Sequence, residues 1–185
     1  MRRRRVLGDA ADMKSWRGVF FILGGLLGML GVTSCSTTVD SLGGAKADRA
    51  EIENRIASIR DSIRARKAEG IVHYGTADWS FTGPDGVTFN RASYLVRAEA
   101  LFARVPVIES LETKIDRLVT TVTTAEVEIT QTMVRREIDP ATKAESRVWL
   151  RYREQHLWLK TDRGWCVQRV AFLGAPERKI LPPGP

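Results

Sequence analysis

The apolar residues of this chain change their spacing part of the way along it, and this change constrains the fold more than any other feature. Four isoleucines between Ile52 and Ile63 fall on one stripe of a helix, which we expect to run from Asp48 to about Gly70. From residue 112 onward apolar residues recur at every second position, the period of a strand with one buried face. Helices followed by long strands predict an α+β fold, in which helices pack on one face of a curved antiparallel sheet.

The remaining elements follow from turn and capping signals. Residues 69–79 are expected to form a second, short helix, and Pro84-Asp85-Gly86 a turn between two short strands. Asn90 is a suitable N-cap for a third helix, which should end near Pro106. Four long strands are then expected as a meander, over residues 112–123, 125–138, 146–160 and 165–172.

Two stretches, together with this order of elements, resemble a known family. The turn segment 78–86 (DWSFTGPDG) and the ending 157–165 (LWLKTDRGW) look like the SnoaL-like branch of the nuclear-transport-factor-2-like superfamily, over residues 48–173. The resemblance implies a cone-shaped fold, with the sheet wrapped around the helices and a pocket, that serves as enzyme, ligand binder or dimerisation module. Fold alone does not decide among these roles. Similar enzymes use a tyrosine and a protonated carboxylic acid facing a general-base aspartate, or an aspartate-arginine-aspartate group that activates water.

The strand expected over residues 146–160 supplies candidate pocket residues. Strict alternation places Tyr152, Glu154 and His156 on one face, which we expect to point into the cone. A bulge near Gln155 is the alternative, because it would swap the faces and leave Glu154 and His156 in solvent. The pocket candidates on the opposing segment are Tyr74, Asp78 and Trp79.

Two of these candidates are carboxylates with the chemistry of a general base. A carboxylate whose pKa is raised by an apolar cone can exchange a proton near neutral pH, which suits Asp78 or Glu154. Alternatively, Asp78 is a turn residue that accepts hydrogen bonds from local backbone N–H groups. No spacing identifies a reaction, so the catalytic residues stay unassigned and a non-enzymatic role is favoured.

The amino-acid composition excludes several classes of binding partner. The chain has only two histidines, His73 and His156, and no C-x-x-C pair, so neither a protein-built metal site nor a cofactor is predicted. Residues 1–34 hold six of the 29 basic and two of the 22 acidic residues, which leaves 23 basic and 20 acidic residues beyond them. These charges are interspersed and form no recognisable motif, so a nucleic-acid partner is not expected.

An uncharged run at residues 18–32 precedes the first cysteine. Fifteen helical residues reach only about 22 Å, which is short of a bilayer core of about 30 Å, so the run fits the apolar core of an export signal. The following Val32-Thr33-Ser34-Cys35 resembles a bacterial lipobox, in which the cysteine is lipidated and becomes the new N-terminus. An ordinary signal peptide and an uncleaved anchor are the alternatives, and Met13 is a better signal start than Met1.

These features divide the chain into a signal peptide (1–34), a lipidated Cys35 with a flexible tether (35–47), the cone domain (48–173) and a proline-rich tail (174–185). We expect a lipoprotein, acylated for example with palmitate, that faces the periplasm or exterior of a bacterial cell envelope. If the host is diderm, the outer membrane is favoured. The domain is expected to bind a small apolar ligand or a protein partner, or a second copy through the sheet face. The alternative is an enzyme of the ketosteroid-isomerase or epoxide-hydrolase type.

Overall fold

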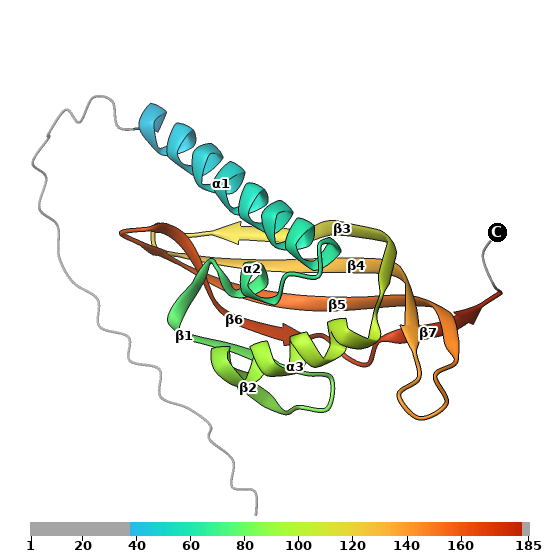
Figure 1. Cartoon of the computed structure of the whole chain (residues 1–185). Helices are drawn as coiled ribbons and strands as arrows, with labels where there is room; N and C mark the ends of the chain where they lie inside the picture. Colours follow the sequence, from blue (N-terminus) through green and yellow to red (C-terminus); the bar gives the residue numbers. More distant parts are fainter. Residues whose placement is uncertain (1–37, 183–185) are drawn as a thin grey trace, which may run out of the picture. The chain divides into compact units, whose positions relative to one another are not determined.

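In the computed structural model, which describes residues 38–182, two helices come first and the long strands last (Figure 1). The predicted signal peptide and Cys35 lie outside the described residues. The helices are α1 (Thr38–Arg64), α2 (Ala68–Val72) and α3 (Arg91–Arg104). The strands are β1 (Gly75–Thr82), β2 (Thr88–Asn90), β3 (Val107–Thr120), β4 (Thr124–Ile138), β5 (Glu145–Thr161), β6 (Gly164–Phe172) and β7 (Glu177–Leu181).

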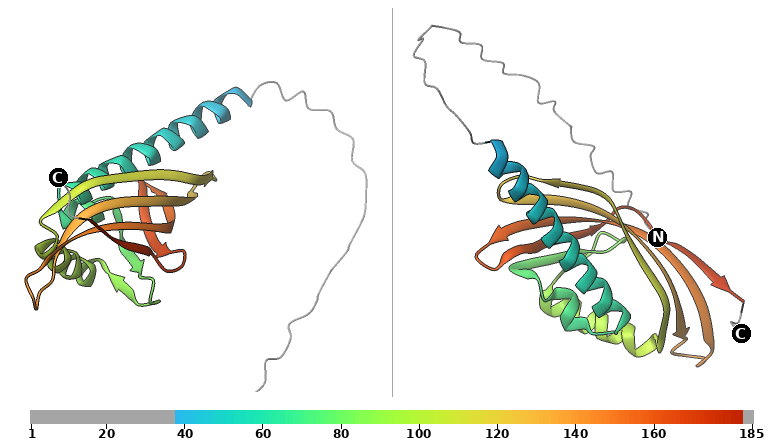
Figure 2. Two further views of the ribbon diagram at one scale, coloured as in Figure 1. Left: turned by 90° about the vertical axis from the view of Figure 1, so that its right-hand side faces the viewer. Right: turned by 90° about the horizontal axis from the view of Figure 1, so that it is seen from above.

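The strands form one curved sheet in the order β2-β1-β6-β5-β4-β3, with β7 pairing with β5. Strands β3 to β6 are an antiparallel meander, as predicted, whereas β1 runs parallel to β6. Helices α1 and α3 cover the concave side of the sheet (Figure 2). The expected α+β cone is therefore confirmed.

The isoleucine stripe of α1 supplies the helical side of the main core. Ile52 and Ile56 are buried and pack in one cluster with Trp158 and Trp165, which come from β5 and β6 and are fully buried. The predicted cap of α3 is also present, since the Asn90 side chain accepts a hydrogen bond from the Ser93 backbone N–H at 2.9 Å.

Two element bounds differ by a few residues, since α1 ends at Arg64 and not near Gly70, and β3 begins at Val107 and not at residue 112. Three larger differences stand beside these. Helix α1 begins ten residues before Asp48, so residues 38–47 of the expected flexible tether are helical. These residues contain no proline, and the pair Gly43-Gly44 lowers helix stability by only about 1 kcal/mol per glycine. Helix α2 ends at Val72, and residues 75–82 form β1. The expected proline-rich tail contains β7, because residues 177–181 lie between prolines and have free backbone N–H groups to pair with β5.

A polar cluster attaches α1 to the β5–β6 hairpin. The Asp48 carboxylate accepts hydrogen bonds from Lys160 Nζ at 2.7 Å and from Trp165 Nε1 at 3.0 Å. One turn further along α1, Glu51 accepts a hydrogen bond from the Trp165 backbone N–H at 3.1 Å. After another turn, Arg55 donates to the Trp165 carbonyl at 2.6 Å. The side chain and both backbone groups of Trp165 are therefore held by α1.

This attachment predicts a pH dependence of stability. Hydrogen bonds from Lys160 and Trp165 hold the pKa of Asp48 below its usual range. The contribution of Asp48 to the free energy of unfolding is therefore complete above the unfolded-state pKa of about 4. The contribution is lost as the pH falls through the lower folded-state pKa. We expect Asp48→Asn to be less stable than wild type at pH 7, and to lose less stability than wild type on acidification to pH 3.

Urea denaturation at the two pH values measures both differences. Asp162→Asn is the matched control, because Asp162 is exposed in the hairpin turn and makes no hydrogen bond with the described residues. An Asp48→Asn midpoint that shifts with pH as much as the wild-type midpoint would contradict the attachment.

Candidate functional site

A cavity of about 500 Å³ lies between the helices and the concave face of the sheet. This volume falls within the range of about 300–1,000 Å³ that is usual for small-molecule sites. Most of its walls are apolar, and α1, α3 and five of the strands contribute to it. The walls include Ile59, Ile63, Trp79, Phe81, Tyr94, Ala98, Met133, Leu150, Val167, Val170 and Phe172.

A chain of hydrogen bonds crosses the sheet side of this cavity. The Tyr152 hydroxyl donates to Gln131 Oε1 at 3.2 Å, and Gln131 Nε2 donates to Glu154 Oε2 at 3.4 Å. His156 Nε2 lies 3.1 Å from the same Glu154 oxygen. Glu154 is only 7% exposed, and its other oxygen, Oε1, makes no hydrogen bond with any described residue. A buried carboxylate therefore keeps a free acceptor at the cavity wall.

The alternation of β5 places these side chains. Tyr152, Glu154 and His156 lie on the concave face, and all three line the cavity. Pairing of β5 with β4 is continuous from Glu145 to Leu159, and the irregularity in its pairing with β6 falls after Leu157. The structure thus has no bulge at Gln155 that swaps the faces.

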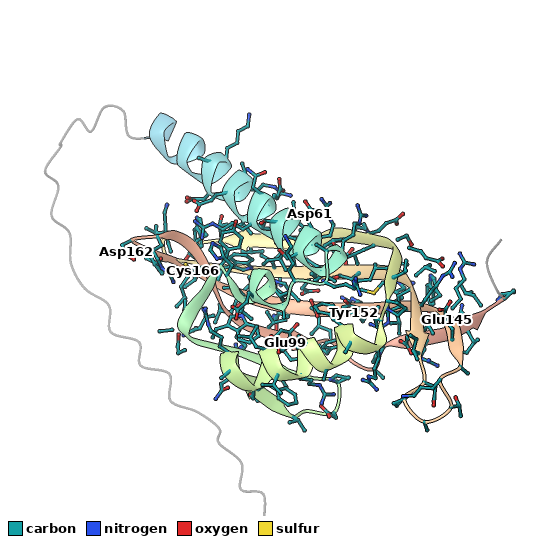
Figure 3. All side chains as sticks on the ribbon, in the orientation of Figure 1. Asp61, Glu99, Glu145, Tyr152, Asp162 and Cys166 are labelled. Atoms are coloured by element: carbon teal, nitrogen blue, oxygen red, sulfur yellow. The ribbon has the colours of Figure 1, made fainter. Side chains whose placement is uncertain are left out.

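Five aromatic rings line the same cavity as the Glu154 carboxylate. Tyr94 of α3 contacts Trp79 and Phe81 of β1, with ring centroids 5.0 and 4.9 Å apart. Phe172 of β6 contacts the Phe81 ring edge-on at 5.6 Å and stacks on Tyr152 at 5.1 Å. Tyr152 lies near the middle of the sheet in Figure 3. Each such aromatic pair contributes about 0.5–1.5 kcal/mol beyond the burial of its surface.

Two of these rings carry hydroxyl groups that stay protonated. Burial, and next to it the nearby Glu154 carboxylate, raises the pKa of both Tyr94 and Tyr152 above the usual value for a phenol. At neutral pH both phenols are therefore hydrogen-bond donors. The Tyr152 hydroxyl is already bonded to Gln131, whereas the Tyr94 hydroxyl has no partner among residues 38–182.

Not all the residues proposed from the sequence meet in the cavity. Trp79 lines it together with Tyr152, Glu154 and His156. Tyr74 does not line it, because its hydroxyl donates to Ser58 Oγ at 3.3 Å and its ring packs against Arg55.

Asp78 also lies away from the cavity. It precedes Trp79 on β1, so its side chain points to the opposite, exposed face and accepts a hydrogen bond from Gln168 Nε2 at 2.6 Å. Of the two candidate bases, only Glu154 faces the cavity.

Sequence reasoning missed five polar residues of the site, namely Tyr94, Gln131, Arg97, Arg104 and Arg135. Tyr94 lies on the apolar face of α3, where it reads as an ordinary core residue. Gln131 carried a usable signal, because it occupies an inward position of β4 between Ile129 and Met133, where the period-two pattern calls for an apolar side chain. A glutamine there indicates a polar partner inside the cone.

Metal ligation finds no support in the described part of the chain. Among residues 38–182, no three His, Cys, Asp or Glu side chains come together as ligands for a metal ion. Cys166 is buried and unpaired, and it lies toward the hairpin end of the sheet, away from Tyr152 (Figure 3).

The sequence matches no known family model and no curated protein. The fold, in contrast, matches solved structures. A conserved protein from Planctomyces limnophilus superposes with a TM-score of 0.60 and 19% identity, over 71% of this chain and 99% of that chain. A ketosteroid isomerase-like protein from Erwinia carotovora gives 0.54 and 17%, over 72% and 96%.

A scytalone dehydratase-like protein from Novosphingobium aromaticivorans superposes with a TM-score of 0.58 and 14% identity, over 80% of this chain and 94% of that chain. A protein from Cytophaga hutchinsonii that is described as NTF2-like gives 0.54 and 12%, over 69% and 98%. At these identities the similarity shows the fold. This chain therefore contains a domain with the nuclear-transport-factor-2-like fold.

Proposed function

We propose that the cone domain binds a small, mainly apolar molecule in its cavity, and that Glu154 accepts a hydrogen bond from a polar group of that molecule. The supporting observation is the half-satisfied carboxylate of Glu154 in an aromatic cavity. A buried charge is costly unless hydrogen bonds surround it, and a hydrogen bond to a charged group contributes about 1.5–3 kcal/mol. A ligand with a hydroxyl group supplies the missing donor.

Binding is measured by calorimetric titration with octan-1-ol, an apolar chain that carries one hydroxyl. Ala98→Phe adds a ring to α3 where Ala98 lines the cavity, and we expect it to weaken binding at least tenfold, or about 1.4 kcal/mol. Ala92→Phe is the matched control, because Ala92 lies on the same helix and is exposed. Equal affinities of these two folded variants would place the site elsewhere.

The proposed location is a bacterial cell envelope, with the domain attached by a lipid on Cys35. Support comes from the apolar run and the lipobox-like residues that precede the domain. Among the described residues, no helix combines the length and apolar character needed to cross a membrane. A membrane-bound binder would meet apolar molecules where they concentrate. Pairing of two copies through the outer sheet face stays a prediction.

Changing Cys35→Ser tests the anchor, because serine lacks the thiol that would take the lipid. In bacteria that process lipoproteins, we expect the variant to remain unprocessed at this site, to incorporate no labelled fatty acid, and to leave the membrane fraction. Cys166→Ser is the control, since Cys166 is buried inside the domain. Wild-type protein without any labelled fatty acid would exclude the anchor.

A proton-transfer enzyme is the second candidate, since Glu154 lies beside Tyr152 and His156 in the cavity. In a β,γ-unsaturated ketone, Glu154 would take a proton from the α-carbon and return it to the γ-carbon, while the double bond moves from the β,γ to the α,β position. The free Tyr94 hydroxyl would donate to the ketone oxygen while negative charge develops there. Two fold relatives are described as ketosteroid isomerase-like and scytalone dehydratase-like, which fits this chemistry.

Conversion of cyclohex-3-en-1-one to its conjugated isomer, followed by ultraviolet absorbance, tests this candidate. We expect Glu154→Gln to lower the rate at least about 100-fold, because the amide cannot accept the proton. The same variant should keep its fold, since glutamine has the same size. No conversion by the wild-type protein above the buffer rate would argue against catalysis on this class of ketone and leave the binding function in place.

A further inference from the structure

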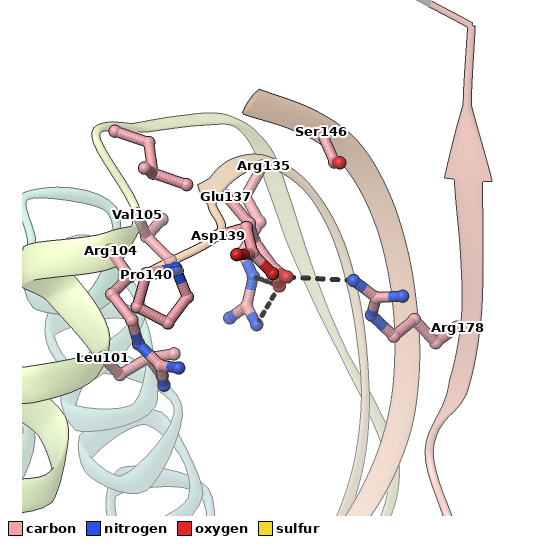
Figure 4. A pocket seen from close by; sticks show the side chains of 10 residues that line it. Leu101, Arg104, Val105, Arg135, Glu137, Asp139, Pro140, Ser146 and Arg178 are labelled. Atoms are coloured by element: carbon pink, nitrogen blue, oxygen red, sulfur yellow. Dashed lines mark hydrogen bonds and ion pairs between the residues drawn. The ribbon is translucent and has the colours of Figure 1, made fainter. Parts of the chain in front are cut away.

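A second cavity, of about 330 Å³, adjoins the first. The two share four wall residues, Leu101, Arg104 and Val105 at the end of α3 and Arg135 of β4. The remaining walls come from the end of β4, the β4–β5 connection, the start of β5 and β7 (Figure 4). The two cavities therefore meet at these four residues.

Charged side chains dominate the second cavity. Arg104, Arg135 and Arg178 line it together with two acids, Glu137 and Asp139, so the walls carry one more positive than negative charge. Glu137 binds both of its neighbouring guanidinium groups: Arg135 donates through Nε at 2.8 Å and also through Nη2, and Arg178 donates through Nη2 at 3.0 Å (Figure 4). Glu137 thus fixes arginines from β4 and β7 side by side.

The arginines keep unused donors. A guanidinium group has five N–H donors, and Arg178 uses only Nη2 within the described residues. Arg104 is exposed and makes no hydrogen bond or ion pair with any described residue. The Asp139 carboxylate, in contrast, is engaged by its own loop, where Oδ1 accepts the backbone N–H groups of Ala141 and Thr142 at 2.9 and 2.8 Å.

We propose that this second cavity binds the anionic group, a carboxylate or a phosphate monoester, of the same molecule whose apolar body occupies the first cavity. The inference rests on the proposed binding function and narrows its ligand class to single-chain amphiphilic anions. Arginine forks match the planar carboxylate and the phosphate oxygens in geometry. The anionic end of the ligand lies at the arginines and away from the buried Glu154 carboxylate. Repulsion between these two negative charges therefore sets the orientation of the bound ligand.

The experiment compares 8-hydroxyoctanoate with octan-1-ol, which has the same chain without the anion, by calorimetric titration of the full-length protein at low salt. We expect the anion to bind at least tenfold more tightly. Arg104→Gln should remove most of this advantage, and Arg104→Glu should remove it entirely. Arg169→Gln is the matched control, because Arg169 is exposed, lines neither cavity and has no partner among the described residues.

The outcomes separate the two proposals. Tight binding of octan-1-ol with no gain from the carboxylate would overturn the anion site and leave the proposed function standing. Failure of both compounds to bind would overturn both proposals. An equal loss in Arg104→Gln and Arg169→Gln would also overturn the anion site, because it would reflect general surface charge. A parallel titration with 8-hydroxyoctyl phosphate distinguishes carboxylate from phosphate selectivity.

Discussion

Strand β5 is the element on which the rest of the domain depends. It pairs with β4 from Glu145 to Leu159, with β6 over its second half and with β7 over its first. Its concave face carries the apolar residues Val148 and Trp158 at the two ends and the polar group around Glu154 between them. One uninterrupted alternation therefore builds both the core and the site, and a slip by one residue would destroy both.

The buried polar side chains of Gln131, Glu154 and His156 would lower the stability of a core that served packing alone. His156 Nδ1 and the indole nitrogens of Trp79 and Trp158 are buried without a partner in the described residues. Each unsatisfied polar group of this kind lowers stability by about 1–3 kcal/mol. The main core compensates through the attachment of α1 to the hairpin, where the Trp165 backbone and indole are fully bonded.

Most of the fold follows from periodicity, because each helix and long strand shows its buried face in the local sequence. The cap at Asn90 and the inward face of β5 are local patterns of this kind. The site is less predictable, since it depends on which side chains from separate elements meet. Tyr94 and Tyr74 look alike in sequence, but only Tyr94 reaches the cavity. Strand β7 was missed because its flanking prolines mask residues that are free to pair.

Strand β7 has a consequence for how this domain can diversify. Its residues are mostly exposed, it contacts the rest of the sheet through β5, and it brings Arg178 to the second cavity. Substitutions on this short strand leave the apolar cavity and the main core untouched. If the second cavity holds an anionic group as proposed, related chains can acquire a new head-group preference by substitutions on this peripheral strand, without any change in the buried interior.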